Sequence, residues 1–61
     1  MTKQDALEKY DSNIDIIDKA KRYLKECLET GQDKYGLVDY YKREIINAKQ
    51  RNRYLIKKYF N

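Results

Sequence analysis

The sequence predicts an all-α protein, a two-helix antiparallel hairpin of the coiled-coil type. Two stretches carry apolar residues at alternating spacings of three and four, which is typical of helices that pack lengthwise on each other. A short segment bounded by Gly31 and Gly36 separates them, and the 61 residues include no proline to interrupt either stretch. We therefore expect one domain, residues 1–61, with helix one over 3–30, a turn over 31–36 and helix two over 37–60.

Helix one has a start signal and a stop signal. Thr2 and Asp5 form a T-x-x-D capping box, and Gly31 suits the left-handed position that follows a helix. A second box, Ser12 with Asp15, offers an alternative start ten residues later. The continuous 3–4 spacing favours the longer helix, whose predicted contact positions are Leu7, Tyr10, Ile14, Ile17, Lys21, Leu24 and Leu28.

Helix two is the more regular stretch. Its predicted contact positions are Val38, Tyr41, Ile45, Ala48, Asn52, Leu55 and Tyr59. Either Asp33 or Gly36 is a candidate cap for its first turn. Folding the hairpin pairs Asn52 with Ile14, and a polar residue at such a position fixes the register of helices at some cost in stability. We therefore expect Asn52→Ile to stabilise the fold.

The size of the chain favours self-association. Sixty-one residues are few for a self-sufficient core, and one cysteine with no histidine leaves little room for disulfides or a structural metal. We expect a homodimer that forms a four-helix bundle. The expected dimer or partner face, which combines small residues with tyrosines, is made of Ile16, Ala20, Tyr23, Cys27, Leu37, Tyr40 and Tyr54.

Charge is unevenly distributed along the chain. The net charge is +4, but residues 32–61 hold eight bases against three acids, and no acid follows Glu44. Such asymmetry indicates an anionic partner, although a solvated face with cations near the helix C-terminus explains it equally well. The candidate residues for an anionic partner are Lys49, Arg51, Arg53, Lys57 and Lys58.

The sequence points away from catalysis. It has no histidine, and nothing near Cys27 suggests an activated nucleophile. We expect no enzyme activity, no cofactor and no metal. No apolar run is long enough to span a bilayer, and the lone cysteine favours a reducing cytoplasm. A composition rich in Lys, Ile, Asn and Tyr suits an AT-rich bacterial or phage genome.

These observations favour a non-enzymatic protein-interaction module, a regulator or inhibitor that docks a helical face on a larger protein. In size and shape the expected hairpin resembles small helical regulators of low-G+C bacteria, such as sporulation kinase inhibitors. The S-Q-x-x-D-type signature of the hairpin aspartyl phosphatases does not occur. The alternative is a small nucleic-acid-binding accessory protein that uses the basic C-terminal helix.

Overall fold

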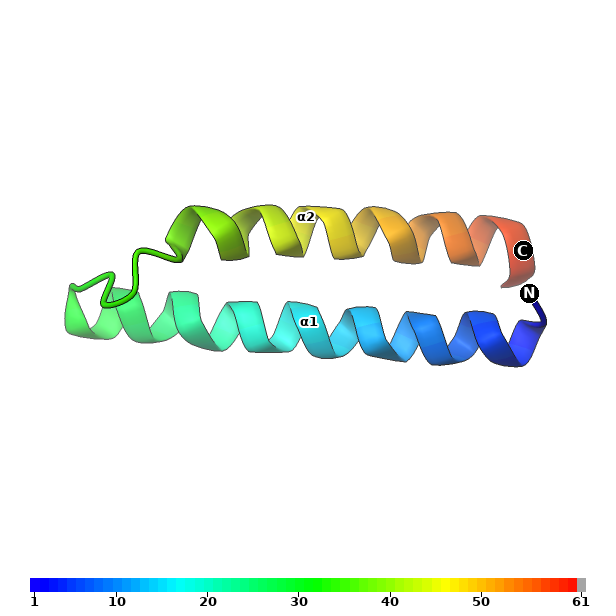
Figure 1. Ribbon diagram of the computed structural model, residues 1–61, viewed down its shortest axis with the longest axis horizontal. Helices are drawn as coiled ribbons and strands as arrows, with labels where there is room; N and C mark the ends of the chain where they lie inside the picture. The colour runs from blue at the N-terminus through cyan, green and yellow to red at the C-terminus, as the bar shows by residue number, and fades with distance from the viewer. Residues whose placement is uncertain (61) are drawn as a thin grey trace.

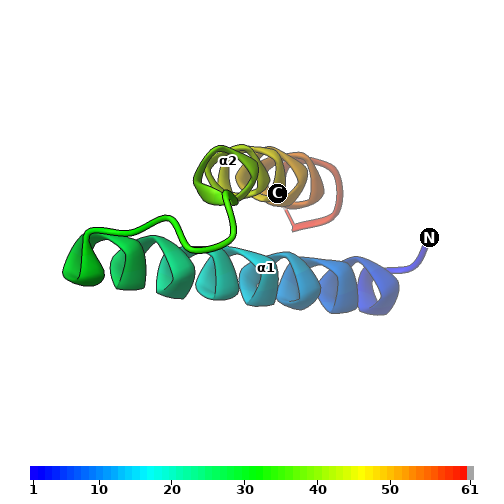
Figure 2. The ribbon, with the colours of Figure 1, turned by 60° about the vertical axis from the view of Figure 1, so that its left-hand side comes forward.

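Two helices lie side by side and run in opposite directions in the computed structural model, which describes residues 1–60. Helix α1 spans Lys3–Thr30 and helix α2 spans Val38–Leu55, and the chain continues into a π-helical turn, η1, at Ile56–Phe60. Figure 1 shows both ends of the chain at one end of the rod and the α1–α2 loop at the other, and Figure 2 shows α2 beside α1 from a second direction. The rod measures 42 × 15 × 14 Å.

Both ends of α1 carry the caps that the sequence predicts. The Asp5 backbone N–H donates to Thr2 Oγ1 at 3.1 Å, and the Thr2 N–H donates to Asp5 Oδ2 at 3.2 Å. This reciprocal pair satisfies two donors that a helix N-terminus otherwise leaves unpaired. At the other end, Gly31 takes the left-handed conformation, with φ at 71°, and its N–H donates to the Cys27 carbonyl. The alternative start at Ser12 is wrong, because α1 continues through it.

The start of α2 depends on the loop. Leu37 occupies the N-cap position and its side chain makes no capping bond, so neither Asp33 nor Gly36 is the cap itself. Asp33 nevertheless accepts a hydrogen bond from the Leu37 N–H at 3.0 Å, which satisfies one donor of the first turn. Gly36 permits this path because its φ is 65°, a value that side chains disfavour.

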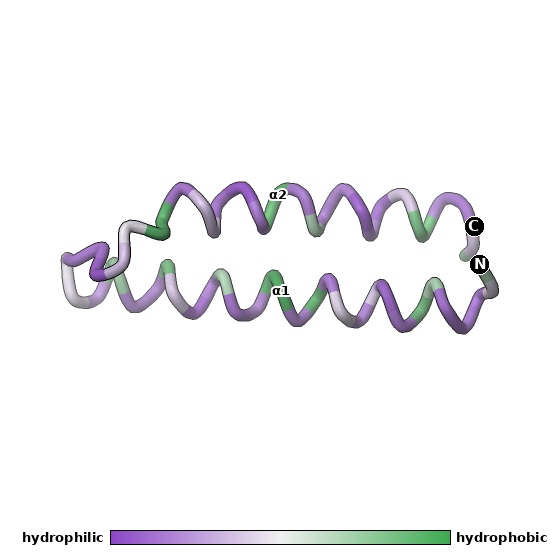
Figure 3. Tube along the Cα trace, in the orientation of Figure 1, coloured by the Kyte–Doolittle hydropathy of each residue, from purple (hydrophilic) through white to green (hydrophobic). Residues whose placement is uncertain are grey.

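The contact surface of α2 lies where the sequence predicts it. All seven predicted positions are buried or half-buried, with Ala48, Asn52 and Leu55 the most enclosed. Figure 3 shows the hydrophobic residues recurring along the edge of α2 that faces α1, with hydrophilic residues between them. The 3–4 spacing therefore gives the correct rotation of this helix.

The contact surface of α1 is rotated from the prediction by one residue. Ala6, Asn13, Ile17 and Ala20 are buried, whereas the predicted positions Leu7, Ile14, Lys21 and Leu28 are exposed. Ile17 is common to both sets, and the predicted positions Tyr10 and Leu24 are half-buried. The part of the predicted contact surface made by Tyr10, Ile17 and Leu24 is thus correct. The part made by Leu7, Ile14, Lys21 and Leu28 is wrong.

Close approach of the helices explains this rotation. Ala6, Ala20 and Ala48 are each 0% exposed, and small residues let two helix backbones come near each other. The same rotation places the Asn13 amide where its Nδ2 donates to Asn52 Oδ1 at 2.8 Å, so the expected pairing of Asn52 with Ile14 is wrong. It also takes Lys21 off the helix contact, so that this residue is exposed.

Candidate functional site

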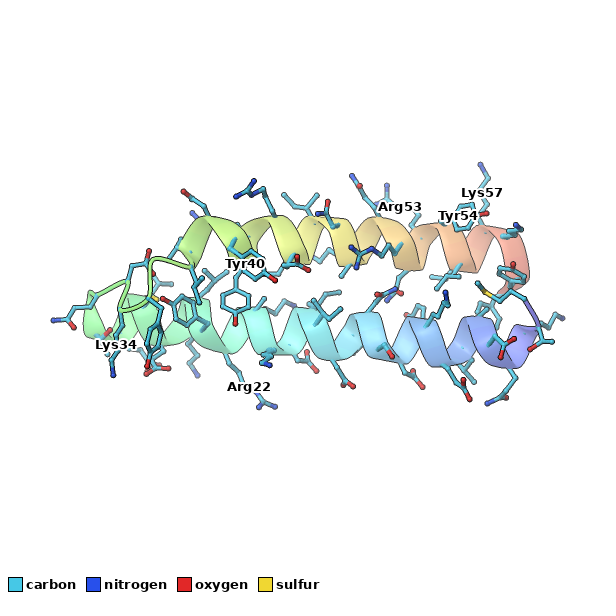
Figure 4. All side chains as sticks on the ribbon, in the orientation of Figure 1. Arg22, Lys34, Tyr40, Arg53, Tyr54 and Lys57 are labelled. Carbon is cyan, nitrogen blue, oxygen red and sulfur yellow. The ribbon has the colours of Figure 1, made fainter. Side chains whose placement is uncertain are left out.

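The first surface, which we call the aromatic face, contains most of the expected dimer or partner residues. Four of them are half-buried along the edge of the helix pair: Ile16, Tyr23, Cys27 and Leu37. Tyr40 and Tyr54 are exposed. Figure 4 shows Tyr40 lying over the space between α1 and α2.

Ala20 does not belong to the aromatic face. Its side chain is completely buried, and it stands on the contact row of α1 with Asn13 and Ile17. A residue inside the hairpin cannot also contact a second molecule, so its assignment to an outer face is wrong. The small side chain serves the approach of α2 instead.

Tyr23 anchors the loop to the aromatic face. Its hydroxyl donates to Asp33 Oδ1 at 2.6 Å and accepts from the Tyr35 N–H at 3.1 Å, and its ring centroid lies 5.0 Å from that of Tyr41. Burial, followed by the bond to Asp33, raises the pKa of Tyr23 to about 12. The bond donated by Tyr23 lowers the pKa of Asp33. The sequence does not reveal this cluster, because only the loop path brings Asp33 and Tyr35 back to Tyr23.

The second surface lies on the opposite side of the helix pair, and we call it the cationic groove. Two rows with seven-residue spacing line it, and that spacing returns each member to nearly the same side of its helix. The α1 row is Leu7, Ile14, Lys21 and Leu28, and the α2 row is Lys42, Lys49 and Ile56, with Phe60 one turn beyond. Every one of these residues is exposed.

Two hollows show that the rows face each other. Near the chain ends, Leu7 and Tyr10 enclose an open hollow of about 220 Å³ together with Ile56 and Phe60. Near the loop, Leu28 shares a second hollow with Lys42. The two rows therefore face each other near both ends of the helix pair. The 3–4 spacing does not predict this surface, because it places the α1 row in the helix contact.

The five bases expected to face an anionic partner do not form one surface. Helical spacing places Lys49 and Arg53 on the groove side, Arg51 on the side of the aromatic face and Lys57 on the outer side of α2. Figure 4 shows Lys57 pointing away from α1. Lys58 is already engaged, because its Nζ donates to the Tyr54 hydroxyl at 3.1 Å and this bond raises its pKa.

Among residues 1–60, no three His, Cys, Asp or Glu side chains are grouped so that they could hold a metal ion. No helix in the described part of the chain is sufficiently long and apolar to cross a membrane. The Cys27 thiol is half-buried and free.

Comparison of the chain with protein-family models, with curated proteins and with solved structures finds no match in any of the three.

Proposed function

We propose that this chain is a small non-enzymatic interaction module, a regulator or inhibitor that docks a helical face on a larger protein. The observation that carries the proposal is the exposure of large apolar side chains after the helix contact is complete. Scattered apolar residues are normal on any surface. Here they fall in helical rows on two opposite sides, as Ile14 and Ile56 do on one side and Tyr40 and Tyr54 do on the other.

Affinity capture tests the docking function. The tagged chain is expressed in its source cell and its bound proteins are identified, beside an Ile14→Ser variant for the groove and a Tyr40→Ser variant for the aromatic face. Ile14 is 37% exposed and Tyr40 49% exposed, so each change removes apolar surface that a partner could contact. We expect one discrete larger protein that one of the two variants fails to capture. Recovery of no specific protein would contradict the function.

We also propose that two copies of the chain associate through the aromatic face. Tyr40 and Tyr54 offer large, rigid contact areas, and charges of both signs lie beside them at Glu44 and Arg51. Two-fold symmetry lets such a mixed surface pair with its own copy to form a four-helix bundle. We place this dimer in the cytoplasm, where the half-buried Cys27 thiol stays reduced.

Sedimentation equilibrium measures the dimer. Tyr40→Glu combined with Tyr54→Glu should yield monomers, because four carboxylates would meet across the two-fold axis. Ile46→Glu is the control, since Ile46 is exposed on the groove side of α2. A parent chain that sediments as a monomer at high micromolar concentration would rule out this part of the proposal.

A nucleic-acid-binding accessory role is the second candidate, favoured by the absence of acidic residues after Glu44. It is tested by titrating duplex DNA and single-stranded RNA at low and high salt. Phosphate binding should weaken steeply as salt rises, and replacing Lys49, Arg51, Arg53, Lys57 and Lys58 by Gln should abolish it. No binding by the parent at low salt would retire this candidate.

A further inference from the structure

The cationic groove has the form of a site for a third helix. Its two rows stand on antiparallel helices on either side of one groove, and each row repeats every seven residues. A helix that packs lengthwise presents apolar residues at the same period. Leu7, Ile56 and Phe60 line the hollow of about 220 Å³ at the end of the rod that holds the chain termini. Ile14 follows Leu7 by seven residues in the same row.

The charged residues of the groove indicate the sign of the charge on its partner. Lys21, Lys42 and Lys49 are the charged members of the two rows, and all are basic. Arg53, four residues beyond Lys49, extends the basic edge on α2. Acids lie one row further out on α1, where Asp11 and Asp18 follow Leu7 and Ile14 by four residues. The acids of this surface thus stand on the α1 edge, and the charged residues of the α2 edge are all basic.

Other occupants fit this pattern less well. A second copy would double the excess of bases on this surface, where Lys21, Lys42, Lys49 and Arg53 outnumber the acids beside the α1 row, and like charges across an interface are unfavourable. A bilayer suits a helix whose apolar face is continuous, whereas Lys21 interrupts the α1 row between Ile14 and Leu28. A nucleic acid would satisfy the lysines but would leave the apolar end of the groove without a complement.

We propose that the cationic groove binds an amphipathic helix of a partner protein, with apolar residues against Leu7, Ile14 and Ile56 and carboxylates against Lys42, Lys49 and Arg53. This inference rests on the proposed function, because it names the docking face and the chemistry of the partner. The apolar contacts supply affinity, and the carboxylates select the partner and set its orientation in the groove.

Two synthetic peptides test the charge selection. Each is a three-heptad helix with Leu at the contact positions, one with Glu and the other with Lys at the flanking positions. Each carries a fluorophore, is held at nanomolar concentration so that it stays monomeric, and is titrated with the full chain by fluorescence anisotropy. We expect the Glu peptide to bind at least about tenfold more tightly than the Lys peptide.

Charge reversal gives the sharper result. In the variant Lys42→Glu/Lys49→Glu/Arg53→Glu the preference should invert, so that the Lys peptide binds more tightly. The matched control is Lys19→Glu/Arg43→Glu/Lys57→Glu, which changes the net charge by the same amount at exposed positions outside the groove. The control should keep the parent's preference. Circular dichroism checks that both variants remain helical.

Several outcomes would overturn the inference. They are equal binding of the two peptides, no binding of the Glu peptide, an unchanged preference after charge reversal, and tighter binding of phosphatidylserine vesicles or duplex DNA. The proposed function is judged separately. If a protein captured from cells is still captured by the charge-reversed variant, the groove assignment fails while the docking function stands.

Discussion

Asn13 and Asn52 form a polar contact inside the helix pair. Their side chains are 7% and 6% exposed, and the Asn13 amide donates to the Asn52 carbonyl oxygen at 2.8 Å. The Asn52 amide in turn donates to the Tyr10 carbonyl at 3.3 Å. A paired amide at this depth is satisfied only in one register, so the contact fixes how far the helices slide past each other.

Asn52→Ile should destabilise the hairpin by about 1–3 kcal/mol, because it leaves the buried Asn13 amide without its acceptor. This reverses the expectation drawn from sequence, which had no buried partner for Asn52. Urea unfolding followed by circular dichroism measures the change. Replacing both residues with Leu should recover part of the loss, since two apolar partners leave nothing unpaired. A higher unfolding midpoint for Asn52→Ile alone would contradict the role of this pair.

Tyr23 couples the stability of the loop to pH. Its pKa is raised to about 12 in the folded chain, above the ordinary value of 10.0, so the neutral phenol is favoured by folding. The stabilisation is complete below the unfolded pKa and is lost as pH rises through about 12. Asp33 behaves in the opposite way: its lowered pKa stabilises the fold above its unfolded pKa, and this is lost in acid.

Tyr23→Phe should lower the melting temperature near neutral pH, because Asp33 and the Tyr35 N–H lose their partner. Above about pH 10 the parent should lose stability faster than the variant, so the two melting temperatures converge. Thermal melts across this range test the idea. Tyr40→Phe serves as the control, since Tyr40 is exposed and lies on α2 outside the loop. If the melting temperatures of the parent and Tyr23→Phe changed with pH in parallel, ionisation of Tyr23 would not be the cause of the stability lost at high pH.

At the scale of the elements, the ends of α1 are set by local chemistry. The capping box uses only residues 2–5, and the left-handed Gly31 closes the helix by donating to Cys27 four residues earlier. Such signals act within one turn and need no tertiary contact. They are the reason that α1 begins and ends where the local sequence indicates.

Gly31→Ala should destabilise the hairpin by about 1 kcal/mol, because an alanine resists the positive φ of this residue. No atom lies within 4 Å of the added Cβ, so the cost comes from the backbone and not from a clash. Gly31→Asn should cost less, since asparagine tolerates this conformation. Thermal melts rank the three proteins. An alanine variant as stable as the parent would mean that the helix end relaxes to another conformation.

At the scale of the whole molecule, the closeness of α1 and α2 depends on alanines. The largest buried apolar side chains are Ile17 and Leu55, and Ala6, Ala20 and Ala48 are completely buried. A core of this size leaves little reserve of stability. Changes inside the contact should therefore unfold the chain rather than alter its association.

Ala20→Glu should destabilise the monomer itself by about 3 kcal/mol or more, because a carboxylate would be buried against α2 without a partner. Circular dichroism should show lost helicity at every protein concentration. Lys19→Glu, at an exposed neighbouring position, should stay within about 0.5 kcal/mol of the parent. If Ala20→Glu kept its helicity and changed only the oligomeric state, Ala20 would face outward after all.

The sequence by itself determined the two helices, the caps of α1 and the contact surface of α2. Each of these follows from residues within a few turns of one another. The rotation of α1 was decided by the tertiary structure. Helix one carries two possible contact rows one residue apart, one through Leu7 and Ile14 and one through Ala6, Asn13 and Ala20.

Apolar content along helix one favours the row with larger side chains, but the energy of contact depends on α2 as well. Close approach at Ala20 and the hydrogen bond from Asn13 to Asn52 exist only when both helices are together. The rotation of α1 also exposes Leu7, Ile14 and Leu28, which belong to the α1 row of the cationic groove. The candidate site was hidden from the sequence for the same physical reason: a pattern along one helix does not contain the side chains that face it.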